Sequence, residues 1–225
     1  MEKTTKGKEA AALAAAELIQ EGMIVGLGTG STVAFFLKRL GERCRQGLTI
    51  KAAASSIRTE KIAQELGIPV IELKGLLDIV VDGADEVDHR KRLIKGGGGA
   101  LLREKMLAFH SRQMVVIVDE EKLVTRLGKA LLPIEIVSFG HEATRKSILE
   151  QRISVMLRLN RENVPYVTDN GNYILDADIS NYNDQLEELD IQLRQIPGVV
   201  ETGLFLGLAN KIIVGHEDGS TQEFV

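Results

Sequence analysis

The chain has 225 residues, of which 44% are hydrophobic and 27% charged. This is the composition of an ordinary globular protein that is long enough to bury a sizeable core. The formal net charge of -4 argues against a nucleic-acid partner, because no basic patch is available to neutralise phosphates. The apolar stretches are too short to span a bilayer, and the charged residues 1–10 lack the pattern of a signal peptide. We therefore expect a cytoplasmic protein with neither a membrane nor a nucleic-acid partner.

The spacing of apolar residues predicts alternating helices and strands through the first half of the chain. Helices are expected at residues 8–19, 31–45, 57–66 and 99–111, and strands at residues 23–27, 49–53, 69–72, 78–82 and 113–118. Strands that alternate with helices in this way are typical of an α/β fold with a doubly wound, mostly parallel sheet.

The pattern changes after Leu131, where strands cluster between two helices. Strands are expected at residues 133–138, 153–158, 165–168 and 172–177, and helices at residues 142–151 and 183–196. This grouping predicts a second, smaller α+β unit. The tail beyond Gly198 reads as short strands.

A first glycine cluster follows the first expected strand. Gly26, Gly28 and Gly30 lead into a helix that Ser31 or Thr32 is expected to cap. The dinucleotide-binding pattern fails at Ser31, and the P-loop pattern fails because no Gly-Lys-Ser/Thr follows. The next strand is followed by two serines, with no acid to hold a ribose hydroxyl. A phosphomonoester is therefore a more suitable ligand for this turn than a dinucleotide. The alternative is a tight turn that binds no ligand.

A second cluster gathers acids, a lysine and four glycines within 24 residues. Asp82 and Asp85 fall just past the carboxyl end of an apolar strand, where open α/β sheets bind their ligands. Lys95 precedes the glycines at 96–99, whose backbone N–H groups can approach an anion or a developing oxyanion. Glu104 lies on the first turns of the next helix, which points its positive end at the same place.

Each part of this second cluster also has a plainer interpretation. Asp-Gly pairs and glycine runs are usually surface turns, and Glu104 with its charged neighbours could belong to a solvated helix face. The presence of several complementary roles in one short stretch nevertheless favours an active site.

Neither the histidines nor the single cysteine indicates a metal or a nucleophile. The four histidines are scattered without metal-binding spacing. The acidic run that begins at Asp82 has Val87 where a calcium-binding EF-hand loop needs glycine, so we expect no metal. Arginines flank Cys44 and could lower its pKa, but an inert thiol is the favoured interpretation. One cysteine cannot form an internal disulfide, which fits a reducing compartment.

Taken together, these motifs resemble the ribose-5-phosphate isomerase family of the metal-independent type A. The resemblance lies in residues 26–32, 82–86, 95–98, 103–105, 132–136, 168–172 and 197–205. It spans nearly the whole chain. Two positions and one segment depart from the expected family pattern: Gly99 where many members are expected to have alanine, Leu102 where threonine is expected, and residues 154–162, which lack the glycine-rich character expected there.

The resemblance implies interconversion of ribose 5-phosphate and ribulose 5-phosphate through an enediolate, without a cofactor. Glu104 is the implied base that moves a proton between C2 and C1. Asp82 is expected to assist ring opening, while Asp85 and Lys95 handle the O1 and O2 protons and the enediolate charge. Lys95 and the glycine N–H groups would form the oxyanion site.

Substrate binding is implied for both glycine clusters and for two lysines, namely Thr29, Gly30, Ser31, Thr32, Gly83, Ala84, Gly96, Gly97, Gly98, Lys122 and Lys8. Within this set, Ser31, Thr32 and Lys122 are the implied phosphate ligands, and Lys8 joins them. By the same resemblance the tail returns to the first domain. Residues 1–127 plus 200–225 then form the catalytic α/β domain and residues 128–199 the smaller α+β domain, in an expected homodimer or homotetramer.

Two other classes of function compete with this interpretation. Another enzyme on the same scaffold could be a sugar-phosphate deaminase, which needs a histidine near the acids, or a coenzyme A transferase relative, which needs a glutamate nucleophile. A sugar-phosphate sensor would keep the phosphate loop and lose the base. The joint presence of Glu104, Asp82, Asp85 and Lys95 disfavours the sensor.

Overall fold

The computed structural model of the chain describes residues 3–182 and 185–224, which form two compact units. The first unit comprises Met1–Ala84, Arg103–Leu123 and Gly207–Val225, and the second comprises Asp85–Leu102 and Val124–Leu206. The expected domain division, residues 1–127 plus 200–225 against residues 128–199, stays a prediction, because a compact unit need not be a folding domain.

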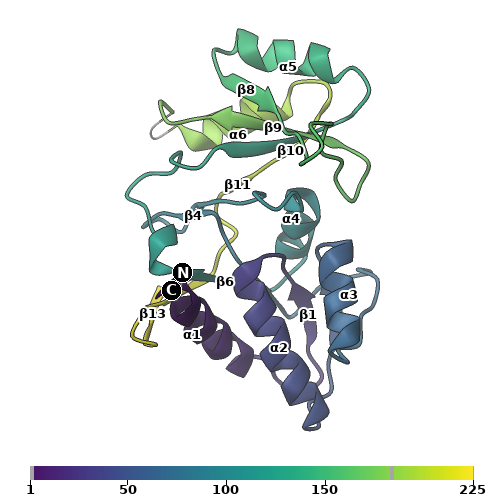
Figure 1. The fold of residues 1–225 in the computed structure, drawn as a ribbon, viewed down its shortest axis with the longest axis vertical. Coiled ribbons are helices and arrows are strands. Elements are labelled where there is room, and N and C mark those ends of the chain that lie inside the picture. Colours follow the sequence, from purple (N-terminus) through teal and green to yellow (C-terminus); the bar gives the residue numbers. More distant parts are fainter. Residues whose placement is uncertain (1–2, 183–184, 225) are drawn as a thin grey trace. The chain divides into compact units, whose positions relative to one another are not determined.

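A six-stranded sheet forms the centre of the first unit (Figure 1). Its strand order is β13 (Thr221–Phe224), β12 (Lys211–Gly215), β6 (Met114–Asp119), β3 (Ile79–Asp82), β1 (Ile24–Leu27) and β2 (Lys51–Ala54). Neighbouring strands are parallel except for the antiparallel pair of β12 and β13. The predicted α/β class with a mostly parallel sheet is therefore confirmed.

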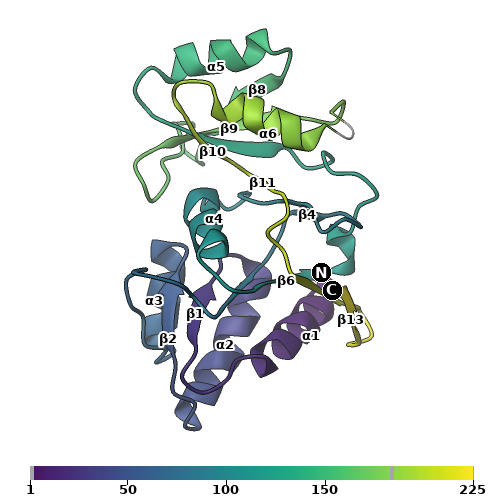
Figure 2. The same ribbon diagram turned by 180° about the vertical axis from the view of Figure 1, so that it is seen from behind.

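Helices cover this sheet and bury its apolar side chains. They are α1 (Lys3–Glu17), α2 (Ser31–Arg45), α3 (Ile57–Glu65) and α4 (Leu101–Phe109). In α2, Val33, Phe36, Leu37 and Leu40 recur at helical spacing and are buried in the core that α1 and α3 share. Figure 2 shows α4 on the side of the sheet away from α2. Strands β3 and β6 are buried along their whole length, as expected of strands covered on both faces.

The second unit is built on antiparallel strands. Its larger sheet has the order β10 (Val199–Thr202), β7 (Leu132–Ile136), β9 (Tyr173–Asp178) and β8 (Ser154–Leu157). Helices α5 (His141–Glu150) and α6 (Leu186–Arg194) pack on this sheet through a separate hydrophobic core. A small sheet joins β11 (Leu204–Phe205), β5 (Leu93–Ile94) and β4 (Glu86–Val87).

Two of the predicted strands are wrong. Residues 69–72 make only a single bridge, from Val70 to Ala52, and residues 165–168 make only the bridge from Pro165 to Leu159. Both segments contain a proline, which has no N–H to donate to a ladder. The short strands β4 and β5 were not predicted, whereas β10 and β13 lie in the tail beyond Gly198 that was expected to form short strands. The helix expected at 183–196 begins at Leu186, and residues 183–184 lie outside the described part of the chain.

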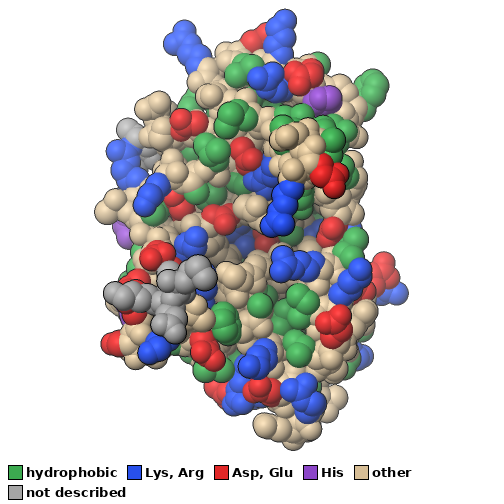
Figure 3. Space-filling model, in the orientation of Figure 1, with side chains coloured by type: hydrophobic (Ala, Val, Ile, Leu, Met, Phe, Trp, Pro, Cys, Tyr) green, Lys and Arg blue, Asp and Glu red, His purple; other side chains and the backbone are tan. Residues whose placement is uncertain are grey.

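No helix within the described ranges is both long and apolar enough to cross a bilayer. On the face drawn in Figure 3, acidic and basic side chains are interspersed without a large patch of either sign.

Candidate active site

Asp82 lies against the glycine turn that follows β1. Strands β1 and β3 are parallel neighbours, with Leu27 opposite Val81, so the segments that leave their carboxyl ends are adjacent. The backbone N–H of Thr29 donates to Oδ1 of Asp82 at 3.1 Å, and that of Gly83 donates to the same oxygen at 2.7 Å. The Asp82 side chain is fully buried. Backbone donors from both turns therefore orient this carboxylate.

Gly28 makes this close approach possible. A Cβ at Gly28 would lie 2.0 Å from Oδ1 and 2.6 Å from Cα of Asp82, and neither separation is sterically allowed. The acid at the end of the neighbouring strand therefore explains the glycine at position 28 without a dinucleotide ligand.

The hydroxyl of Thr29 belongs to a buried cluster that the sequence analysis missed. Its Oγ1 lies 2.8 Å from Oγ of Ser55, 2.8 Å from Oγ of Ser56 and 3.0 Å from Oγ1 of Thr59. Thr59 also donates to the carbonyl oxygen of Gly28 at 2.9 Å. Ser56 is the N-cap of α3 and accepts the backbone N–H of Thr59 at 3.0 Å. Its place before a helix was the signal that could have identified it.

The prediction that Ser31 or Thr32 caps α2 is wrong. Gly30 occupies the N-cap position with φ at 141°, and no side chain caps the helix. Glycine alone tolerates this backbone conformation, so Gly30 takes the cap position and Ser31 and Thr32 lie inside the helix. Ser31 is exposed and Thr32 is buried. The first turn of α2 therefore presents backbone N–H groups at the positive end of a helix, an arrangement that suits an anion.

Glu104 lies in the first turn of α4, and only 4% of its surface is exposed. The alternative that Glu104 belongs to a solvated helix face is therefore wrong. A carboxylate in the first helical turn interacts favourably with the positive end of the helix dipole.

Lys8 and Lys122 lie near the carboxyl end of β6. Nζ of Lys8 is 3.8 Å from Oδ2 of Asp119, the last residue of that strand. Asp119 also caps the short helix η1 (Glu120–Lys122), because its Oδ1 accepts the N–H of Glu121 at 3.0 Å. Lys122, the last residue of η1, is half-buried. The structure thus gives Lys8 a carboxylate partner and places Lys122 on an ordered turn.

In the second unit, Lys95 and Asp85 flank the glycine turn. Lys95 is 2% exposed, and its Nζ lies 5.4 Å from the centre of the Phe205 ring, within the range of a cation–π contact. The backbone N–H of Gly97 donates to Oδ2 of Asp85 at 2.7 Å. The predicted oxyanion donor at Gly97 is thus directed at the Asp85 carboxylate. A Cβ at Gly97 would lie 2.7 Å from Asp85 Oδ1, so glycine is needed here for the approach.

Two acids between Asp85 and Lys95 have structural partners. Glu86 accepts the N–H of Ala130 at 2.5 Å and that of Gly128 at 2.8 Å. Asp88 pairs with Nε of Arg92 at 2.7 Å, and both side chains are buried. Glu86 and Asp88 therefore stabilise the loop, whereas Asp85 lies beside the glycine turn.

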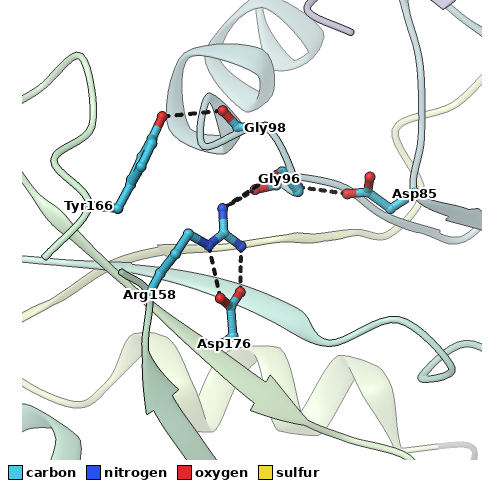
Figure 4. Close-up of polar contacts among 7 residues, drawn as sticks. Asp85, Gly96, Gly98, Arg158, Tyr166 and Asp176 are labelled. Carbon is cyan, nitrogen blue, oxygen red and sulfur yellow. Dashed lines mark hydrogen bonds and ion pairs between the residues drawn. The ribbon is translucent and has the colours of Figure 1, made fainter. Parts of the chain in front are cut away.

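Side chains from the segment between β8 and β9 also hold the glycine turn (Figure 4). Arg158 donates to the carbonyl oxygens of Gly96 and Gly97, and Tyr166 donates to that of Gly98. Neither residue was predicted from the sequence. Arg158 lies in the segment 154–162, whose only sequence signal was its departure from the family pattern, and Tyr166 lies just beyond it.

Cys44 is a free, half-buried cysteine. Burial raises the pKa of its thiol above the ordinary value, and this effect exceeds the lowering by Arg43 and Arg45. The two arginines do act to lower this pKa, as the sequence suggests, but burial outweighs them. Among the described residues, no three His, Cys, Asp or Glu side chains gather in a metal-binding arrangement.

The chain matches known proteins over nearly its whole length. The family model of ribose 5-phosphate isomerase A (phosphoriboisomerase A) matches residues 51–219. The ribose-5-phosphate isomerase A of Protochlamydia amoebophila is 46% identical over 96% of this chain and 94% of its own length. That of Thermoplasma acidophilum is 46% identical over 95% of this chain and 90% of its own length.

Solved structures agree with these relatives. The isomerase of Methanocaldococcus jannaschii has a TM-score of 0.91 and 36% identity, and the match covers 96% of this chain and 97% of that one. A D-ribose-5-phosphate isomerase solved in complex with phospho-erythronic acid has a TM-score of 0.92 and 37% identity, with 96% of each chain covered.

A parallel sheet that carries a buried acid at its carboxyl edge, beside a glycine turn and a helix N-terminus, defines an α/β enzyme. Together with the matches, this arrangement confirms the resemblance found in the sequence. The chain belongs to the ribose 5-phosphate isomerase A family.

Proposed function

We propose that four side chains carry the isomerisation for which the family is named: Glu104, Asp82, Asp85 and Lys95. The chain is an aldose-ketose isomerase that interconverts D-ribose 5-phosphate and D-ribulose 5-phosphate through an enediolate, in the non-oxidative pentose phosphate pathway. This reaction requires ring opening of the sugar and then transfer of a proton between C2 and C1.

The burial of Glu104 is the observation that supports this proposal best. A carboxylate with 4% of its surface exposed is shielded from bulk water, so a proton that it accepts from C2 is available for return to C1. Its place in the first turn of α4 gives it a fixed position on a regular element. We therefore assign the base to Glu104.

The other three residues are assigned to the oxygen atoms of the sugar. Asp82, which two backbone N–H groups orient, assists ring opening by exchanging a proton with the ring oxygen. Asp85 handles a hydroxyl proton during the transfer. The Lys95 ammonium, together with N–H groups of the turn at Gly96 and Gly98, stabilises the negative charge of the enediolate, while the N–H of Gly97 donates to Asp85.

The substrate phosphate is assigned to the first turn of α2 and to two lysines. Gly30, Ser31 and Thr32 supply backbone and hydroxyl donors at a helix N-terminus, and helix N-termini favour phosphate. Lys122 and Lys8 supply positive charge. Thr29, Gly83 and Ala84 complete the set of residues proposed to line the sugar.

A substitution at Glu104 tests the proposal. Glu104→Gln keeps the shape and hydrogen-bonding capacity of the side chain but cannot accept a proton. We expect kcat to fall by roughly two to four orders of magnitude, with little change in KM. The assay follows ribulose 5-phosphate formed from ribose 5-phosphate, with a chelator present throughout.

The matched control is Glu65→Gln on α3, which changes an exposed carboxylate and should leave both constants unchanged. Near wild-type turnover of Glu104→Gln would remove Glu104 as the base. Tight binding of ribose 5-phosphate without turnover by the unmodified protein would instead support a sugar-phosphate sensor.

We also propose that the protein works in the cytoplasm on a small-molecule substrate, without a nucleic-acid or membrane partner, as a homodimer or homotetramer. Sedimentation velocity separates these assemblies from a monomer of 24.6 kDa. A single species at the monomer mass would contradict the proposed assembly.

A further inference from the structure

Arg158 follows β8 and binds both the Asp176 carboxylate and the backbone of the glycine turn (Figure 4). Its Nε donates to Oδ2 of Asp176 at 2.8 Å, and its Nη2 donates to the other oxygen of the same carboxylate. Its Nη1 donates to the carbonyl oxygens of Gly96 at 2.9 Å and Gly97 at 3.1 Å. Asp176 lies on β9, opposite Met156 of β8. A guanidinium fixed on one edge by a carboxylate therefore presents its other edge to the glycine turn.

The carbonyl oxygen of Gly96 and the N–H of Gly97 belong to one peptide plane. Because the described peptide bonds are all trans, the two groups of this plane point in opposite directions. The oxygen points to Arg158 at 2.9 Å, and the N–H points to Oδ2 of Asp85 at 2.7 Å. Any rotation that carries the oxygen away from Arg158 also carries the N–H away from Asp85.

We propose that Arg158 is a positioning residue, which orients the Asp85 carboxylate through the peptide plane between Gly96 and Gly97. The role of Asp85 in the reaction rests on the proposed function, whereas the orientation of the peptide plane does not. Arg158 acts through the backbone, so its effect is expected in turnover rather than in phosphate binding.

Tyr166 supports the same turn from a second direction. Its hydroxyl donates to the carbonyl oxygen of Gly98 at 3.3 Å. A Cβ at Gly99 would lie 2.3 Å from this hydroxyl oxygen, and φ of Gly99 is +84°. Burial is the main cause of a raised pKa at Tyr166, which keeps its hydroxyl protonated as a donor. Gly99, which has no Cβ, thus leaves the space that Tyr166 fills.

The loop that carries Tyr166 is anchored to β7. Oε1 of the fully buried Glu135 accepts hydrogen bonds from Thr168 at 2.9 Å, from Asn170 at 3.0 Å and from Asn172 at 2.9 Å. The backbone N–H of Tyr166 also donates to the carbonyl oxygen of Arg158 at 2.9 Å. The two residues that hold the glycine turn are therefore joined to each other and to the sheet.

Two variants of Arg158 test the proposal. Arg158→Met removes every donor at similar length, and Arg158→Lys keeps the charge but cannot bridge Asp176 and both carbonyl groups. We expect Arg158→Met to lower kcat about ten- to a hundredfold with KM nearly unchanged, since small misplacements of reacting groups cost rates of this order. Arg158→Lys should recover only part of the loss. The control is Arg161→Gln, which changes an exposed arginine three positions away.

A double-mutant cycle separates positioning from a general structural effect. In an Asp85→Ala background, Arg158→Met should cause no further loss of kcat, because the group that it orients is already gone. A loss as large in that background as in the wild type would overturn the proposal.

Amide hydrogen exchange of the peptide that covers residues 94–101 gives a readout that does not depend on activity. Exchange should be about tenfold faster in Arg158→Met and unchanged in Arg161→Gln. Faster exchange in a protein without isomerase activity would uphold the orientation and reject the proposed function; unchanged exchange would overturn the orientation. If Arg158→Met does not fold, Asp176→Asn, which loosens the guanidinium, should show the same changes in exchange and kcat to a smaller degree.

Discussion

The contact between Gly28 and Asp82 shows how one missing side chain defines a site. Asp82 is a fully buried acid whose Oδ1 receives two backbone N–H groups. Its position depends on a neighbour that has no Cβ. In this turn Gly28 leaves room for Asp82 of the adjacent strand, and Gly30 caps the helix that follows.

Gly28→Ala should consequently damage both stability and activity. The added Cβ would meet the Cα of Asp82 at 2.6 Å as well as its carboxylate, so backbone must move and not only a flexible side chain. We expect a loss of about 1 to 3 kcal/mol in the free energy of unfolding, together with a fall in kcat of about a hundredfold.

Urea denaturation and steady-state kinetics measure these two effects. Gly75→Ala is the matched control, since a Cβ at Gly75 would meet nothing within 4 Å. Equal stability of the Gly28 and Gly75 variants would refute the steric argument.

Lys122→Ala tests the assignment of the substrate phosphate at the residue scale. A charge-assisted contact to phosphate exists in both the ground state and the transition state, so its loss raises KM more than it lowers kcat. The expected cost is roughly 1.5 to 3 kcal/mol, and the control is Lys146→Ala on α5, which is exposed. An unchanged KM and an unchanged affinity for a sugar-phosphate inhibitor would mean that Lys122 is only a surface charge of its turn.

At the scale of elements, long amphipathic helices were predicted better than short strands. Helix α2 was predicted at 31–45 and runs from Ser31 to Arg45, because its buried face repeats within the helix itself. Strands β4 and β5 contain only two residues each and are defined by pairing with each other and with β11. Strands of two residues are too short to show a hydrophobic period, and their partner β11 is distant in sequence.

The same distinction applies to the candidate site. Asp82 could be singled out because its place after an apolar strand is a local signal. Arg158 could not, since it meets Gly96 across 62 residues of sequence and only the folded chain joins them. The cap of α2 was predicted wrongly because the preference for serine and threonine was applied without the backbone conformation of Gly30.

The contribution of the N-cap residue Ser56 to the stability of α3 can be predicted. Ser56→Ala removes the acceptor for the N–H of Thr59 and one neighbour of the Thr29 hydroxyl. We expect the free energy of unfolding to fall by about 1 kcal/mol, seen as a lower urea midpoint with an unchanged slope. Ser154→Ala, which alters an exposed serine on β8, should leave the midpoint in place, and the prediction fails if the two variants denature together.

At the scale of the whole molecule, the chain builds its first unit from three separate segments. It leaves this unit after Ala84 and after Leu123, and it returns at Arg103 and at Gly207. The last return supplies β12, which pairs in parallel with β6 over five residues and carries β13 on its other side. The central sheet is thus completed by a strand near the end of the sequence.

This position of β12 has a consequence for folding during translation. A ribosome that has just added Leu206 has supplied every residue of the second unit, but not the strand that covers one side of β6. The unit that begins first is therefore finished last. Until residues 211–215 emerge, β6 exposes an open edge to which the strand of another nascent chain can pair. We therefore expect nascent chains to be most prone to pairing with one another before residues 211–215 have emerged.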